Sequence, residues 1–180
     1  MSLVAFDTLP DEARLWCFAA DRAPEPAETA RLLDAMKEFL EAWTAHGADL
    51  AVGLDWRHHR FLLVAVDESA AGASGCSIDA LVRRLGELEE ELDLRLRDAA
   101  PVWYREPGGE GRIRCVPRPE FRALAGEGLV DARTTVFDLT VASVGELREG
   151  HWEVPAGRAW HARLLPAEAA GTERSPGGRP

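Results

Sequence analysis

The chain contains a single lysine, Lys37, among 21 basic residues, and this scarcity excludes one class of enzyme. A P-loop requires the pattern G-x-x-x-x-G-K-[ST], in which the lysine reaches the phosphates of a bound nucleotide. Lys37 lies between Met36 and Glu38, with no glycine near it. The chain is therefore not a P-loop ATPase.

Cysteines and long apolar runs are also scarce. The three cysteines, Cys17, Cys76 and Cys115, are widely spaced, which matches neither a disulfide framework nor a zinc motif, so we expect reduced thiols, no metal and no cofactor. No apolar run approaches the roughly 20 residues that span a bilayer, and the segment from Met1 to Glu12 carries acids rather than a basic signal region. A cytoplasmic protein without a membrane partner is expected.

Acidic residues outnumber basic ones. The 21 basic and 31 acidic residues give a formal net charge of −10, which opposes non-specific binding to nucleic acid or anionic membranes. The 46% hydrophobic and 29% charged residues are close to the globular average, so a folded chain is expected. Its 180 residues suit one compact domain with an appendage.

The apolar pattern predicts an α+β fold with a ferredoxin-like βαββαβ core. Residues 14–20 resemble a buried strand, residues 50–56 alternate like an edge strand with one wet face, and residues 61–66 are continuously apolar like a central strand. Residues 102–105 or 113–116 supply the fourth strand. This element order is that of a ferredoxin-like sheet.

Two helices complete this core. One has apolar residues at steps of three and four, begins near Pro26 and ends at His46 before Gly47. The other carries an apolar stripe from Ile78 to Leu92 that includes Val82, opposite a run of acidic residues that we expect to face solvent. Helices cover only one face of such a sheet. The apolar central strand therefore requires either the C-terminal third of the chain or a second subunit, in a homodimer, on its other face.

The remaining segments complete the predicted organisation. The C-terminal third forms a small α/β extension packed on the core, in which Ser143 and Glu146 begin a short helix as a capping box. We expect the ends of the chain not to contribute to the fold. The predicted domains are a leader, the core, the extension and a disordered tail, at residues 1–13, 14–116, 117–165 and 166–180.

The densest group of candidate functional residues joins the third strand to the second helix, at residues 67–79. Small residues there let backbone amides approach a ligand or anion at a helix N-terminus, and they are Gly72, Ser74, Gly75 and Ser77. The same position can lower the pKa of the Cys76 thiol and make it a nucleophile or redox centre. Alternatively, Ser74 or Ser77 caps the helix, Asp79 complements its dipole and Cys76 is a small buried residue.

The predicted topology brings a histidine to this loop. In βαββαβ order the end of the first helix meets the start of the second, so His46 lies near Cys76, Asp67 and Asp79, as a thiol enzyme with a base and an orienting acid requires. Alternatively, His46 caps its own helix. His58 and His59 lie in the hairpin turn at the opposite end and are exposed. The last two histidines pack against neighbouring tryptophans, His151 against Trp152 and His161 against Trp160.

The chain resembles a family of small uncharacterised bacterial proteins often labelled "ABC transporter ATPase", over residues 14–165. The family carries no activity, catalytic residue or cofactor to transfer. The residues that carry the resemblance are Leu15-Trp16 with Phe18, Trp43-Thr44-Ala45-His46-Gly47, Phe61 through Glu68, Gly72-Ala73-Ser74-Gly75-Cys76-Ser77-Ile78-Asp79, Thr135-Val136-Phe137 and Trp160-His161.

A second resemblance covers residues 102–155, whose spacing is similar to that of GYF-type peptide-binding modules without the usual Gly-Pro step; we take it as an indication of fold alone. Its residues are Trp103-Tyr104, the turn Gly108 to Gly111, Glu120-Phe121, Leu124, Gly128, Thr135-Val136-Phe137 and Trp152.

Three functions follow as hypotheses. The leading one is a binding or regulatory module that holds a small molecule, an anion or a protein partner at the Asp67–Asp79 loop. The first alternative is a thiol-dependent enzyme or redox protein that uses Cys76 with His46. The second alternative is a structural or dimerising protein that uses the far face of the sheet.

Overall fold

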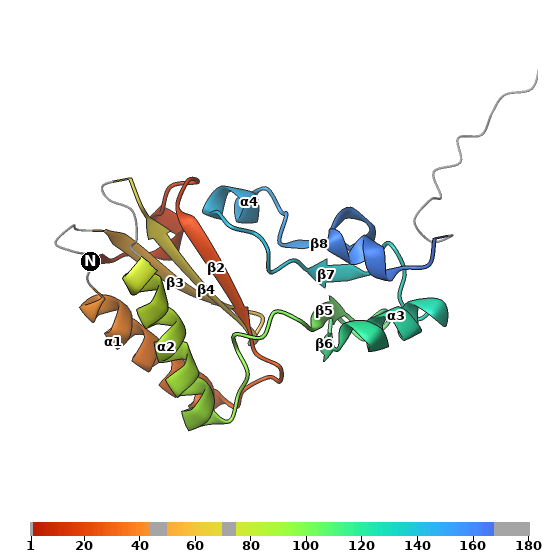
Figure 1. Cartoon of the computed structure of the whole chain (residues 1–180), viewed down its shortest axis with the longest axis horizontal. Helices are drawn as coiled ribbons and strands as arrows, with labels where there is room; N and C mark the ends of the chain where they lie inside the picture. Colours follow the sequence, from red (N-terminus) through yellow and green to blue (C-terminus); the bar gives the residue numbers. More distant parts are fainter. Residues whose placement is uncertain (1, 44–49, 70–74, 168–180) are drawn as a thin grey trace, which may run out of the picture. The chain divides into compact units, whose positions relative to one another are not determined.

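The computed structural model describes residues 2–43, 50–69 and 75–167, and for Gly75, Cys76 and Ser77 it describes the backbone alone. These residues form two units. The first unit comprises Met1–Ala99 and Leu139–Trp152, and the second comprises Ala100–Asp138 and Glu153–Pro180. Each unit is built on its own four-stranded sheet, and the chain is α+β, as the sequence predicts (Figure 1).

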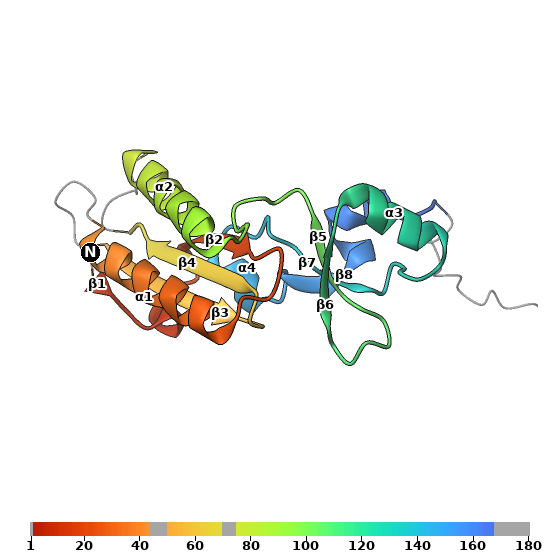
Figure 2. The same cartoon turned by 90° about the horizontal axis from the view of Figure 1, so that it is seen from below.

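The sheet of the first unit has the strand order β1-β3-β4-β2. Strands β3 (Ala51–Arg57) and β4 (Phe61–Asp67) form the expected antiparallel hairpin, β2 (Arg14–Ala19) pairs antiparallel with β4, and β1 (Ser2–Leu3) pairs parallel with β3. The helices α1 (Pro26–Ala42) and α2 (Gly75–Leu92) cover the same face of this sheet (Figures 1 and 2).

The strand order does not confirm the ferredoxin-like core. The fourth strand of that sheet pairs with the first, which here is β2, but β5 (Val102–Arg105) pairs with β6 (Ile113–Val116) in the sheet of the second unit. At the edge of β2 where the fourth strand was expected, an isolated β-bridge joins Arg14 to Ser143 instead. The prediction failed because a four-residue apolar strand carries no information about its partner.

The expectation that the first 13 residues lie outside the fold is wrong for residues 2–13. Besides β1, this segment contains the 3-10 helix η1 (Phe6–Thr8), and Phe6, Leu9 and Ala13 are buried. Strand β3 is therefore not an edge strand, because β1 lies on its outer side. Its predicted wet face is covered as well, since a Cβ at Gly53 would lie 2.7 Å from Cδ1 of Leu9.

The central strand β4 is buried on both faces, as its apolar run predicts. Leu62, Val64 and Val66 pack with the helices. On the opposite face, the ring of Phe61 lies 5.1 Å from the ring of Trp152, which belongs to the segment Leu139–Trp152. Part of the second face is therefore covered by the C-terminal third of the chain, one of the two alternatives that the sequence left open.

Helix α1 differs from the prediction at the end nearest the candidate site. Helix α1 ends at Ala42, four residues before His46, because Trp43 is already extended and its ring stacks on Phe39 at 5.8 Å. Helix α2 begins at Gly75, so Cys76 lies in its first turn, as predicted. Within α2 the apolar stripe is narrower than predicted, since the side chain of Val82 is exposed.

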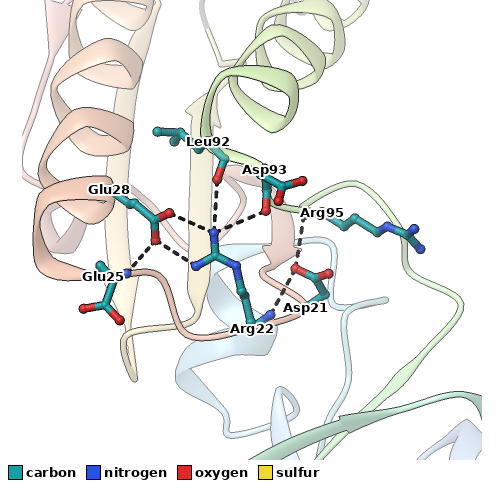
Figure 3. A network of polar contacts seen from close by, with 7 residues as sticks. All are labelled: Asp21, Arg22, Glu25, Glu28, Leu92, Asp93 and Arg95. Atoms are coloured by element: carbon teal, nitrogen blue, oxygen red, sulfur yellow. Dashed lines mark hydrogen bonds and ion pairs between the residues drawn. The ribbon is translucent and has the colours of Figure 1, made fainter.

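Arg22 ties the start of α1 to the end of α2 (Figure 3). Its guanidinium donates to both carboxylate oxygens of Glu28 at 2.8 Å and to the carbonyls of Leu92 and Asp93 at 3.1 and 3.2 Å. The Arg22 bond lowers the pKa of Glu28 to about 2. The same carboxylate accepts the amide of Glu25, which caps α1. The two helices are therefore antiparallel and aligned at this end.

Glu89 belongs to the acidic face of α2 but has a structural role. Its carboxylate accepts the amides of Leu96 and Arg97 at 2.7 and 2.8 Å and binds the Arg97 guanidinium at 2.6 and 2.8 Å. Burial raises the pKa of Glu89, but the bonds from Arg97 and from the two amides outweigh burial, so its pKa lies below the ordinary value. The expectation that the whole acidic run faces solvent is wrong for Glu89.

We expect Glu89→Ala to lower the free energy of unfolding by about 2 kcal/mol, because it leaves two amides and a guanidinium without their charged acceptor. Urea denaturation followed by circular dichroism measures the loss. Glu90→Ala is the matched control, since Glu90 is exposed on the same helix and its removal should change stability by less than about 0.5 kcal/mol. Equal effects in the two variants would contradict the role of Glu89.

The second unit has the strand order β6-β5-β7-β8, with β7 at Thr135–Phe137 and β8 at Glu153–Pro155. Helix α3 (Arg118–Gly126) and the 3-10 helices η2 (Ala156–Arg158) and η3 (Trp160–Leu164) pack with this sheet around Phe121. The short helix α4 (Val144–Arg148) belongs to the first unit, and its Ser143 side chain accepts the amide of Glu146, as predicted.

Candidate functional site

The structure places the end of α1 and the start of α2, which adjoin the predicted site residues, at the same end of the first unit. Ala51, at the start of β3, pairs with Asp67, at the end of β4. The antiparallel helices α1 and α2 have 17 and 18 residues, so each is about 26 Å long at 1.5 Å per residue. Because Arg22 joins them at one end, the end of α1 and the start of α2 lie at the other.

The individual site residues are described to different extents. His46, Gly72 and Ser74 lie outside the described residues, so their predicted roles stay predictions. Gly75, Cys76 and Ser77 form the first turn of α2, described by its backbone alone. The prediction that His46 ends helix α1 is wrong, because α1 ends at Ala42.

The carboxylates at this end have local contacts. Oδ1 of Asp67 accepts the amide of Ser69 at 2.9 Å, and Oε1 of Glu68 lies 3.7 Å from Nη1 of Arg14. Asp79 is exposed on α2. Asp67 therefore stabilises the chain that leaves β4, and Glu68 forms an ion pair with β2.

Of the remaining histidines, His58, His59 and His161 follow the sequence predictions, and His58 makes an additional contact. His58 and His59 lie in the turn that joins β3 to β4, at the opposite end of the sheet from Asp67, and both are exposed. Both have a left-handed backbone, and the ring of His58 stacks on Trp152 at 5.7 Å. His161 is buried and stacks on Trp160, as predicted. His151 is exposed, with its Nε2 3.8 Å from Oε2 of Glu149, so its predicted packing against Trp152 is not confirmed.

The described residues support neither a metal site nor a membrane-spanning helix. Across residues 2–43, 50–69 and 75–167, no group of three or more His, Cys, Asp or Glu side chains is arranged to hold a metal ion. Nor does any helix in this part of the chain combine the length and apolar character needed to cross a membrane.

A groove in the second unit has no counterpart in the sequence analysis. It has a volume of about 370 Å³ and lies where the β5–β6 loop meets the residues before β7. Arg105 and Thr135 face it together with Asp131, whose pKa is lowered by the backbone amide of Arg133. No sequence motif predicts this groove, because its residues come from two segments about 25 positions apart.

Comparisons with known proteins assign neither a family nor a function to the chain. No family model, no curated protein and no solved structure matches the chain. The candidate site therefore depends on the residues and geometry described above.

Proposed function

We propose that the chain is a binding module that holds a small anionic ligand at the first turn of α2 (Gly75–Ile78). The observation that carries this proposal concerns the helix N-termini. Helices α1, α3 and α4 each have a glutamate in the first turn, Glu28, Glu120 and Glu146, whereas α2 has none. Among the four α-helices of the described residues, α2 is therefore the one whose first turn, at its positive end, contains no acidic residue.

The first turn of a helix presents backbone amides that have no partner within the helix, and the aligned peptide dipoles add a partial positive charge. In α1 and α4 the first-turn glutamates also accept a backbone amide just before the helix, that of Glu25 and that of Ala142. At α2 a phosphate or carboxylate of a ligand supplies the negative charge. The sequence before Gly75 consists of small residues, which we expect to leave the backbone accessible to such a group.

The charge of the first unit restricts the class of ligand. This unit carries 22 acidic residues against 11 basic ones, so it repels large polyanions. At the site itself, Glu68 is partly neutralised by Arg14. A small molecule with one phosphate or carboxylate, bound by backbone amides, satisfies both conditions, whereas a nucleic acid does not.

We expect inorganic phosphate, added at constant ionic strength against chloride, to raise the melting temperature of the protein. Ligand at a hundredfold excess over Kd raises stability by about 2.7 kcal/mol. Ser74→Asp places a carboxylate directly before Gly75, so it should stabilise the protein without phosphate and remove the response to phosphate.

Ser69→Asp is the matched control, because it adds the same charge two residues after β4 and should leave the phosphate response in place. An equal response in Ser74→Asp and the wild type, or a response no larger than that to chloride, would contradict the proposal.

The thiol-enzyme hypothesis uses the same turn, because Cys76 lies in the first turn of α2, where a thiolate is stabilised. It stays a prediction, since its base, His46, and the Cys76 side chain lie outside the described residues. In the binding module the amides of this turn bind a ligand, whereas in the thiol enzyme they stabilise the Cys76 thiolate.

A further inference from the structure

His161, in η3 of the second unit, is a buried ionisable group that the proposed function does not use. Its side chain is 1% exposed, and its ring stacks on Trp160 with 3.9 Å between the ring centroids. Its Nδ1 has no hydrogen-bond partner among the described residues. A buried polar atom without a partner costs free energy, so His161 reduces the stability of the second unit at this position.

His161 lies in a segment that is attached mainly by side chains, and we call Ala156–Leu165 the strap. The amides of Ala156 and Gly157 donate to carbonyls of the second unit at 2.9 Å. Beyond them, within the described part of the chain, the backbone bonds of Ala159, Ala162 and Leu165 all go to carbonyls inside the strap. Among the described residues, no ladder of backbone hydrogen bonds therefore holds the second half of the strap to the sheet.

The second half of the strap is held by packing. Leu164 and Leu165 are buried in the core of the second unit with Phe121 and Val136. The guanidinium of Arg118, at the start of α3, lies 4.5 Å from the ring centroid of Trp160. Leaving this position would expose the apolar surface around Phe121.

The charges around His161 oppose its protonation in place. Burial lowers the pKa of His161 most, and the positive charge of Arg118 lowers it further. Asp138, directly after β7, acts in the opposite direction, and the pKa is about 4. The other ionisable residue of η3, Arg163, is exposed. A proton on the buried ring would have no acceptor for its Nδ1–H among the described residues.

We propose that the strap is a detachable element, held on the second unit while His161 is uncharged and released by acid to expose the apolar surface around Phe121. The strap then acts as a pH-dependent cover, distinct from the anion site of the first unit.

The direction of the pH effect follows from linkage. In the released strap His161 has its ordinary pKa of 6.5, and in the attached strap its pKa is about 4. The released state binds the proton more tightly, so attachment is fully favoured above pH 6.5 and weakens as the pH falls toward 4. Because half of the attached His161 is itself protonated at pH 4, the release equilibrium increases roughly 100-fold between pH 7 and pH 4.

Hydrogen exchange measured residue by residue tests this proposal. Between pH 7 and pH 4 we expect the protection factors of the Ala162 and Leu165 amides to fall about 100-fold, while Tyr104 and Val136 in the sheet stay protected. In His161→Phe, which keeps an aromatic ring but cannot be protonated, strap protection should not depend on pH. Arg163→Ala is the control for a charge change on the same element and should behave like the wild type.

Equal loss of protection in His161→Phe and wild type, or loss in the sheet together with the strap, would overturn the proposal. If His161→Phe does not fold, the NMR titration of His161 in the wild type decides. Coupled titration of the His161 ring and the strap amides supports release, whereas a His161 pKa near 6.5 with unchanged strap protection contradicts it.

Discussion

Trp152→Ala is expected to lower the free energy of unfolding by about 3 to 5 kcal/mol, the range for removing a buried tryptophan. The Trp152 side chain is 4% exposed, its ring meets that of Phe61 edge-on, and the Arg57 guanidinium lies 5.7 Å from its centroid. The variant removes the contact by which the segment Leu139–Trp152 covers the strand β4. The loss is measured by urea denaturation followed by circular dichroism.

Leu129→Ala is the control for this experiment, because Leu129 is 56% exposed and its loss should change stability by less than about 0.5 kcal/mol. A loss below about 1 kcal/mol in Trp152→Ala would show that the segment Leu139–Trp152 does not cover the sheet of the first unit in solution.

Gly53→Val is expected to lower the free energy of unfolding by about 3 kcal/mol, because side-chain atoms would be forced into a packed space. A Cβ at this position would lie 2.7 Å from Cδ1 of Leu9 and 3.0 Å from Cα of Phe6. The Leu9 side chain can shift, but the backbone of η1 can move only by leaving β3. Gly53→Ala should cost less, since it adds one carbon.

Gly126→Ala provides the comparison for the smaller variant, because a Cβ there meets no atom within 4 Å. The same urea titration should show no loss of stability for this control. If Gly53→Val were as stable as the wild type, the N-terminal segment would not be packed against β3, and the sequence interpretation of residues 1–13 as a leader would regain support.

Local patterns predicted the elements of the first unit well, because each pattern depends on neighbouring residues. The continuous apolar run of Phe61–Val66 indicated a strand buried on both faces, and the three- and four-residue steps in α1 indicated a helix. Strand β1 could not be predicted, since two residues carry no periodicity. The alternation of residues 50–56 predicts a wet face at Gly53, because a missing side chain gives the same pattern whether water or Leu9 occupies the space.

Long-range pairing was the part that sequence patterns could not supply. Nothing in Val102–Arg105 indicates that this strand begins a second sheet, or that Leu139–Trp152 returns to the first unit. For the candidate site, the element order correctly predicted that β4 ends beside the start of β3. The role of His46 depended on the exact end of α1, and helix ends are less strongly encoded than helix interiors.

The central claim, that backbone amides at the start of α2 bind a small anion, is tested most directly by an NMR titration with inorganic phosphate at constant ionic strength. The account predicts saturable shifts of the backbone amides of Gly75, Cys76 and Ser77, with little change at the N-termini of α1 and α3, where Glu28 and Glu120 already supply negative charge. Shifts of equal size at all these helix starts, or none that saturate at α2, would contradict it.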